Sequence, residues 1–243
     1  MDPTVYVDAF ARDSRVLLDT AHGALDRPVP ACPGWDVEDL VVHVGLVWRW
    51  AAETVERGER AEREPAPEDR REAALLEWAQ EGAARLATVL GAADPDAGCW
   101  TFGMPRTARF WMRRQALETA LHAWDVGAAA GLPVALDPEL ASDGIDELLT
   151  VMVPRFLARE PGGWAGESIH LHRTDGDGEW LVRLGPDGAA DVTRAHGKGD
   201  VALRAGAASL WLWSTNRAPV DDLDIDVFGD RELAARWAAE ISF

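Results

Sequence analysis

Four long stretches of this chain place apolar residues at helical spacing, and this pattern limits the fold more than any other feature. Segments with Pro or Gly separate the stretches and end each one. We predict helices over residues 4–25, 37–57, 68–90 and 107–130. Each would have one apolar face, and four such faces can be buried together when the helices pack side by side. The pattern therefore predicts an up-and-down four-helix bundle.

The pattern changes after this bundle. A fifth amphipathic helix is expected over residues 139–157 as an extension of the bundle, and Gly and Pro residues then mark a boundary at 160–166. Beyond it we predict strands and short helices, over residues 168–173, 179–184, 191–193, 200–204, 205–213, 223–228 and 231–240. The fold class is therefore α+β, with a helical domain over residues 1–159 and a small α+β domain over residues 160–243.

Composition excludes several classes of function. The chain has 243 residues, 47% of them hydrophobic, which is enough for a buried core, but it lacks an apolar run of membrane-spanning length. Asp2 and Asp8 stand where a secretory signal would be basic, so we expect a cytoplasmic protein without a membrane anchor. A formal net charge of −18 disfavours nucleic acid and anionic lipid as partners. Cys32 and Cys99 form neither a disulfide framework nor a Cys-x-x-Cys metal pair.

One predicted helix sets an acid and a histidine four residues apart. Glu118 and His122 leave the same side of that helix, either as an ordinary surface pair or as two ligands of one metal ion. His43 lies on the apolar stripe of the helix at 37–57, either as a core histidine or as a third ligand. Two imidazoles and one carboxylate are a known ligand set of catalytic zinc, with a position left open for water or substrate.

Three neighbours of this pair have two interpretations each. Asp125 follows His122 by three residues, and it is either a surface acid or the acceptor that orients the imidazole of His122. Arg113 and Arg114 are either solvated arginines or groups that balance acids and hold an anionic substrate.

The other histidines suggest no site from sequence alone. His170 and His172 alternate along the strand expected at 168–173 and so share one face, but the third partner that a metal site needs is missing from the pattern. His22 and His196 fit no ligand spacing.

Two motifs carry a family resemblance. Residues 29–45 read Val-Pro-Ala-Cys-Pro-Gly-Trp-Asp-Val-Glu-Asp-Leu-Val-Val-His-Val-Gly, and residues 118–125 read Glu-Thr-Ala-Leu-His-Ala-Trp-Asp. Together they resemble the mycothiol-dependent maleylpyruvate isomerase family, whose N-terminal domain is a DinB-like four-helix bundle. Residues 141–147 are similar to the family segment after the bundle. The resemblance runs in order over nearly the whole chain and is most specific over the bundle.

The resemblance implies a set of site residues and a chemistry. It implies that His43, Glu118 and His122 hold a divalent metal, typically zinc, and that Arg217 acts near the active site, although the residues around Arg217 depart from the usual glycine-arginine pattern. It also implies an enzyme that activates a low-molecular-weight thiol such as mycothiol for attack on a small electrophile. The outcome would be isomerisation or S-transfer, and Arg217 would pair with a substrate carboxylate.

Two other functions compete with this interpretation. The same ligands would serve a metal-dependent hydrolase that activates water, or a non-catalytic module that binds a metal or a small ligand. Lys198 is the single lysine among many arginines and alanines, a composition typical of GC-rich genomes and consistent with an actinobacterial thiol pool. The sequence leaves the electrophile and the oligomeric state open.

Overall fold

The computed structural model describes residues 1–160 and 162–241. Contacts divide the chain into two compact units, Met1–Ala135 and Leu136–Phe243. This division differs from the boundary expected at residues 159 and 160, because the segment after residue 136 packs within the second unit. Gly144 of that segment lies so close to the Trp211 ring that a Cβ atom there would stand 2.3 Å from Cε2. The helical extension therefore belongs with the sheet.

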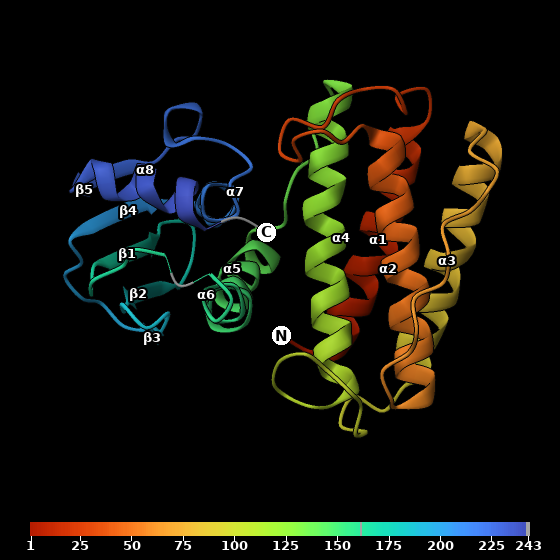
Figure 1. The fold of residues 1–243 in the computed structure, drawn as a ribbon, viewed down its shortest axis with the longest axis horizontal. Coiled ribbons are helices and arrows are strands. Elements are labelled where there is room, and N and C mark those ends of the chain that lie inside the picture. The colour runs from red at the N-terminus through yellow and green to blue at the C-terminus, as the bar shows by residue number, and fades with distance from the viewer. Residues whose placement is uncertain (161, 242–243) are drawn as a thin grey trace. The chain divides into compact units, whose positions relative to one another are not determined.

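The first unit is a four-helix bundle made of α1 (Pro3–Ala21), α2 (Val37–Arg57), α3 (Glu72–Ala92) and α4 (Ala108–Ala130) (Figure 1). The start of α2 is fixed by a capping box, in which the Asp36 side chain accepts from the backbone N–H of Asp39 and the Asp39 side chain accepts from the backbone N–H of Asp36. Gly58 ends α2 with a φ of 68°, a left-handed conformation that glycine adopts without strain. These caps explain why the predicted bounds of α2 are confirmed.

The helix directions differ from the simple up-and-down order that the sequence predicted. The middle helices α2 and α3 run parallel to each other, and α1 and α4 run the opposite way (Figure 1). Residues 58–71 make this possible because they return along α2: Trp50 donates to the carbonyl of Ala61 at 2.9 Å, and Arg70 lies 3.5 Å from Glu38. Fully extended, a segment of this length spans roughly 45 Å, more than the roughly 30 Å of α2.

Large apolar side chains fill the interior of the bundle. The most buried are Phe10, Leu17, Leu40, Trp48, Leu75, Leu86, Leu90, Trp111, Met112 and Leu117. Trp48 of α2 also donates from Nε1 to the hydroxyl of Thr119 on α4 at 3.0 Å, with both residues fully buried. This bond joins α2 to α4 beside Glu118.

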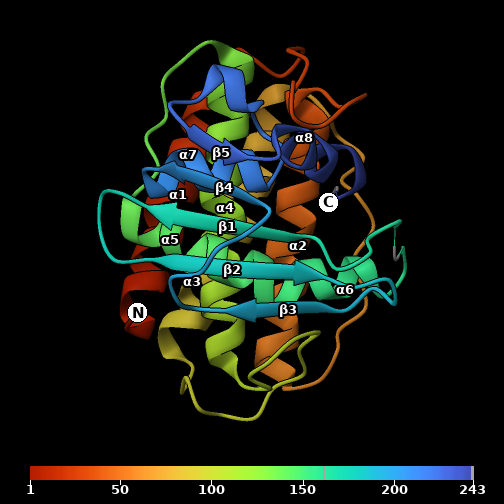
Figure 2. The same ribbon diagram turned by 90° about the vertical axis from the view of Figure 1, so that its left-hand side faces the viewer.

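The second unit is a five-stranded mixed sheet with helices. The strands are β1 (Ser168–Arg173), β2 (Glu179–Leu184), β3 (Ala190–Thr193), β4 (Val201–Ala205) and β5 (Asp226–Gly229), in the order β3-β2-β1-β4-β5 (Figure 2). Strands β1 and β4 are parallel, and the other neighbours are antiparallel. The helices are α5 (Pro138–Glu147), a π-helical turn (Leu148–Met152), α6 (Val153–Leu157), α7 (Ala207–Ser214), a 3-10 turn (Val220–Asp222) and α8 (Arg231–Glu240).

Several element ends differ from the sequence prediction for local reasons. Helix α1 stops at Ala21 because His22 is extended and Gly23 has a φ of 72°. Helix α3 starts after Asp69, whose side chain accepts from the backbone N–H of Arg71 and favours a turn there. Strand β5 begins later than expected because residues 223–225 form a local turn, in which the backbone N–H of Ile225 donates to the carbonyl of Leu223 at 2.9 Å. Within the described part of the chain, we find no helix with the length and apolarity of a membrane span.

Candidate metal centre

Three potential ligands converge between α2 and α4. His43 comes from α2, and Glu118 and His122 come from α4; one ligand atom of each lies within 4.8 Å of the others. The Nε2 atom of His43 is 3.4 Å from Oε1 of Glu118, and the two imidazole centroids are 5.4 Å apart. The three side chains are between 11% and 30% exposed, so the group is sheltered but open to a small ligand.

Arg114 divides the two carboxylate oxygens of Glu118 between different partners. It lies one turn earlier on α4 and donates from a guanidinium nitrogen to Oε2 at 2.8 Å, while Oε1 faces His43. Burial by itself would raise the pKa of Glu118, but the charge of Arg114, the hydrogen bond with His43 and the neighbouring imidazoles outweigh it and hold the pKa well below its ordinary range. Glu118 is therefore anionic, the form that binds a cation.

Asp125 orients the second imidazole of the group. Its Oδ2 atom lies 2.9 Å from Nδ1 of His122, and Asp125 is fully buried. A carboxylate in this position accepts a hydrogen bond from Nδ1–H, and Nε2 is then the unprotonated ring nitrogen, the form that can bind a metal. The structure thus brings together the two residues that sequence spacing had paired.

Trp35 is a neighbour that sequence reasoning did not assign to the site. Its ring centroid lies 5.1 Å from that of His43, and the residue is 36% exposed. It stands in the turn just before Asp36 caps α2, so the cap of that helix also positions an aromatic surface beside the ligands. The signal in the sequence was the Pro-Gly-Trp-Asp run of the first motif.

Arg217 belongs to the second unit. It lies three residues after the end of α7, and its guanidinium donates to the backbone carbonyl of Thr215 at 2.8 Å. A role of Arg217 in binding a substrate carboxylate is therefore a proposal and is taken up below.

The donor set fits a divalent metal. Two imidazole nitrogens and one carboxylate oxygen match the three-ligand arrangement of catalytic zinc, which keeps one coordination position open. The residues around them complete the arrangement, because Arg114 fixes one oxygen of Glu118 and Asp125 fixes one nitrogen of His122.

Comparison with known proteins covers both units. The family model described as the mycothiol maleylpyruvate isomerase N-terminal domain matches residues 7–127, and the model of the corresponding C-terminal domain matches residues 139–236. The chain belongs to the mycothiol maleylpyruvate isomerase family. The family resemblance drawn from the two motifs is therefore confirmed.

Two curated proteins are similar in sequence to this chain. Both are uncharacterised proteins of Mycobacterium tuberculosis, from strains CDC 1551 / Oshkosh and ATCC 25618 / H37Rv. Each is 32% identical over 162 residues, which span 64% of this chain and 79% of the relative.

Solved structures of the family share the fold. A crystal structure of mycothiol-dependent maleylpyruvate isomerase aligns with a TM-score of 0.57 at 15% identity over 90% of this chain and 91% of that chain. A point mutant aligns with a TM-score of 0.58 at 15% identity over 93% of both chains. The predicted fold class, a helical bundle followed by a small α+β domain, is confirmed.

Proposed function

We propose that this protein is a metal-dependent enzyme that activates a low-molecular-weight thiol, mycothiol or a similar compound, for reaction with a small electrophile. One observation supports the proposal most: His43, Glu118 and His122 form a sheltered set of three potential ligands. Three ligands leave one coordination position of a tetrahedral zinc for a thiol, and the chain belongs to a family named for mycothiol and maleylpyruvate isomerase. A cytoplasmic location, where such thiols are kept reduced, is part of the proposal.

The residues of the site have separable roles. A bound zinc-like cation would stabilise a thiolate and lower the pKa of the thiol. Arg114 keeps Glu118 ionised and oriented, and Asp125 holds His122 in the tautomer with Nε2 unprotonated. Trp35 offers an aromatic wall next to His43, where an apolar part of a thiol or substrate can pack.

The reaction begins with attack of the thiolate on an electrophilic carbon of the substrate. In an isomerase the new C–S bond converts a double bond into a single bond, rotation follows, and the thiolate leaves as the double bond re-forms. In a transferase the C–S bond persists in the product: an unsaturated substrate takes up a proton from solvent at the neighbouring carbon, and a halogenated substrate releases halide as the C–S bond forms. Arg217 is the candidate partner for a substrate carboxylate, since a guanidinium binds a carboxylate through two hydrogen bonds.

The test is turnover by the purified full-length protein with zinc, with and without mycothiol. Maleylpyruvate is the first electrophile to offer, followed by a panel of other unsaturated and halogenated carbon electrophiles. We expect product only with thiol present, and mass spectrometry of the thiol separates isomerase from transferase. His43→Ala and His122→Ala should abolish turnover, whereas His22→Ala, at an exposed histidine at the end of α1, should not.

Two results would contradict the proposal. Product formed equally well without thiol would indicate the metal-dependent hydrolase that activates water. Metal bound by the wild type, with no turnover of any electrophile, would indicate the non-catalytic binding module.

A further inference from the structure

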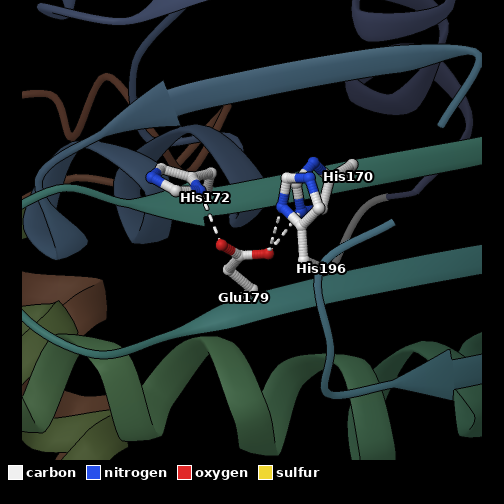
Figure 3. Close-up of side chains that lie close together, drawn as sticks. All are labelled: His170, His172, Glu179 and His196. Carbon is white, nitrogen blue, oxygen red and sulfur yellow. Dashed lines mark hydrogen bonds and ion pairs between the residues drawn. The ribbon is translucent and has the colours of Figure 1, made fainter. Parts of the chain in front are cut away.

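A second group of potential ligands lies in the C-terminal unit. It consists of His170 and His172 on β1, Glu179 on β2, and His196 in the connection between β3 and β4 (Figure 3). One ligand atom from each of the four residues lies within 4.8 Å of all the others. The group thus has one more potential ligand than the group in the bundle.

Strand register explains how three of these residues meet. His172 stands directly opposite Glu179 in the antiparallel pair of β1 and β2, and His170 is two residues along the same strand. Because side chains alternate across a strand, all three point to one face of the sheet.

That face is opposite to the one on which α5 packs. Trp180, next to Glu179, donates to Asp146 of α5, and Arg173, next to His172, pairs with Glu139 of α5. The ligand group therefore lies on the far face of the sheet from α5. There the connection between β3 and β4 brings His196 to it (Figure 3).

The ring nitrogens converge on a single carboxylate. Oε1 of Glu179 lies 2.9 Å from Nδ1 of His172, and Oε2 lies 2.9 Å from Nδ1 of His196. The same Oε2 lies 3.3 Å from Nε2 of His170 (Figure 3). Three imidazoles that aim nitrogen atoms at one small volume, with an anionic oxygen among them, make a donor set that suits first-row divalent metals.

We propose that His170, His172, Glu179 and His196 bind a divalent metal ion of the zinc class. Three nitrogens and one oxygen fill a tetrahedral shell, so the site is closed and structural, unlike the three-ligand group of the bundle. Donor atoms in such a shell lie roughly 3.3 Å apart, so donors that now lie up to 4.8 Å apart draw closer when the ion binds, and the two 2.9 Å contacts of Glu179 lengthen slightly. His196 can provide that movement because its side chain is 82% exposed.

A metal at this position would link parts of the unit that are separate in sequence. It would fasten the connection between β3 and β4 to the hairpin of β1 and β2, and binding would therefore stabilise the folded unit. The competing interpretation is a hydrogen-bonded cluster in which Glu179 pairs with histidines and binds no ion.

Zinc titration of the full-length apoprotein by calorimetry distinguishes a metal site from a hydrogen-bonded cluster that binds no ion. The background is the variant His43→Ala/His122→Ala, which removes the ligands of the bundle. We expect this variant to bind one equivalent of zinc, and its thermal midpoint to rise when zinc is added. Addition of His196→Ala should weaken binding at least about 100-fold, because even the indirect supports of a metal site contribute about 10–100-fold.

The choice of variants separates the loss of a metal ligand from the loss of the fold. His196 is largely exposed, so its replacement should leave the fold intact, which circular dichroism checks. His22→Ala removes a comparable exposed histidine 3.2 Å from Glu72, outside both groups, and should leave zinc affinity unchanged. Absence of zinc binding in the His43→Ala/His122→Ala background would overturn the proposal, and so would binding that persists unchanged after His196→Ala.

Discussion

Arg114 and Glu118 stand one turn apart on α4, and the guanidinium of Arg114 holds one carboxylate oxygen of Glu118 at 2.8 Å while the other oxygen faces His43. This arrangement keeps a sheltered carboxylate ionised and directs one of its oxygens toward two imidazoles. The electrostatics of the centre therefore depend on a residue that is not itself a ligand.

We expect Arg114→Met to weaken zinc binding at neutral pH by about 10–100-fold, the usual effect of removing a group that supports a metal ligand. Without the guanidinium, burial raises the pKa of Glu118 with less opposition, and the carboxylate loses its orientation. Competition with a chromogenic chelator measures the affinity. The matched control is Arg109→Met, also on α4, where the arginine pairs with the exposed Asp96 at 3.0 Å. Equal affinities of the two variants would contradict the role of Arg114.

Asp125→Asn should reduce zinc affinity by a similar factor, about 10–100-fold, with little change in volume. An amide accepts more weakly than a carboxylate, so it no longer holds the Nδ1–H of His122 as firmly. The same chelator competition measures it, with Asp96→Asn as an exposed control on the same unit. An affinity within about twofold of wild type would mean that Asp125 serves the core of the bundle only.

The bond between Trp48 and Thr119 should stabilise the packing of α2 on α4 next to the candidate metal centre. Thr119→Val leaves the buried Nε1–H of Trp48 without its acceptor, which costs about 1–3 kcal/mol of unfolding free energy. Urea denaturation, monitored by circular dichroism, measures this change in the free energy of unfolding. A double-mutant cycle with Trp48→Phe should give non-additive losses; strictly additive losses would show that the two side chains do not interact.

Arg173 should make the second unit sensitive to acid. Its buried guanidinium donates to Glu139 at 2.6 Å and to Asp175 at 2.7 Å. The hydrogen bond from Arg173 lowers the pKa of Glu139; burial raises the pKa of Asp175, but the bonds from Arg173 and from the backbone of Ala207 more than reverse this.

Because both pKa values are lower in the folded state, this stabilisation is complete above the ordinary carboxyl pKa of about 4 and is lost as the pH falls through the lowered values. Arg173→Met should cost about 1–3 kcal/mol at neutral pH and flatten the dependence of the thermal midpoint on pH below about 5. A variant with the same acid profile as wild type would contradict this account.

Local signals account for the parts of the fold that the sequence predicted well. The bounds of α2 follow from the Asp36 cap and Gly58, and the hairpin of β1 and β2 follows from alternation on either side of residues 175–178. The parallel course of α2 and α3 was not predictable in this way. Residues 58–67 separate the helices predicted at 37–57 and 68–90 and are rich in charge and Pro, which leaves their course open. Their path along α2 depends on tertiary contacts such as that of Ala61 with Trp50.

In both groups of potential ligands, local sequence patterns predict some of the contacts, and the others depend on the tertiary fold. Glu118 and His122 are four residues apart on one helix, so periodicity predicted that they share a face. The same pattern left His43 open as a core histidine or a third ligand, and the family resemblance implied that it joins the other two. The pairing of Arg114 with Glu118 at the same spacing was an available signal that the sequence analysis left open. Glu179 could have been placed opposite His172 from the hairpin register, but His196 enters from a connection whose path no local pattern determines.

The most direct test of the central claim is the metal content of protein purified without added metal or chelator, measured in the variant His172→Ala/His196→Ala so that only the bundle group can contribute. We predict about one equivalent of a divalent transition metal, lost when His43→Ala and His122→Ala are added. Less than about a tenth of an equivalent in the folded variant that retains His43, Glu118 and His122 would contradict the metal centre and the thiol chemistry built on it.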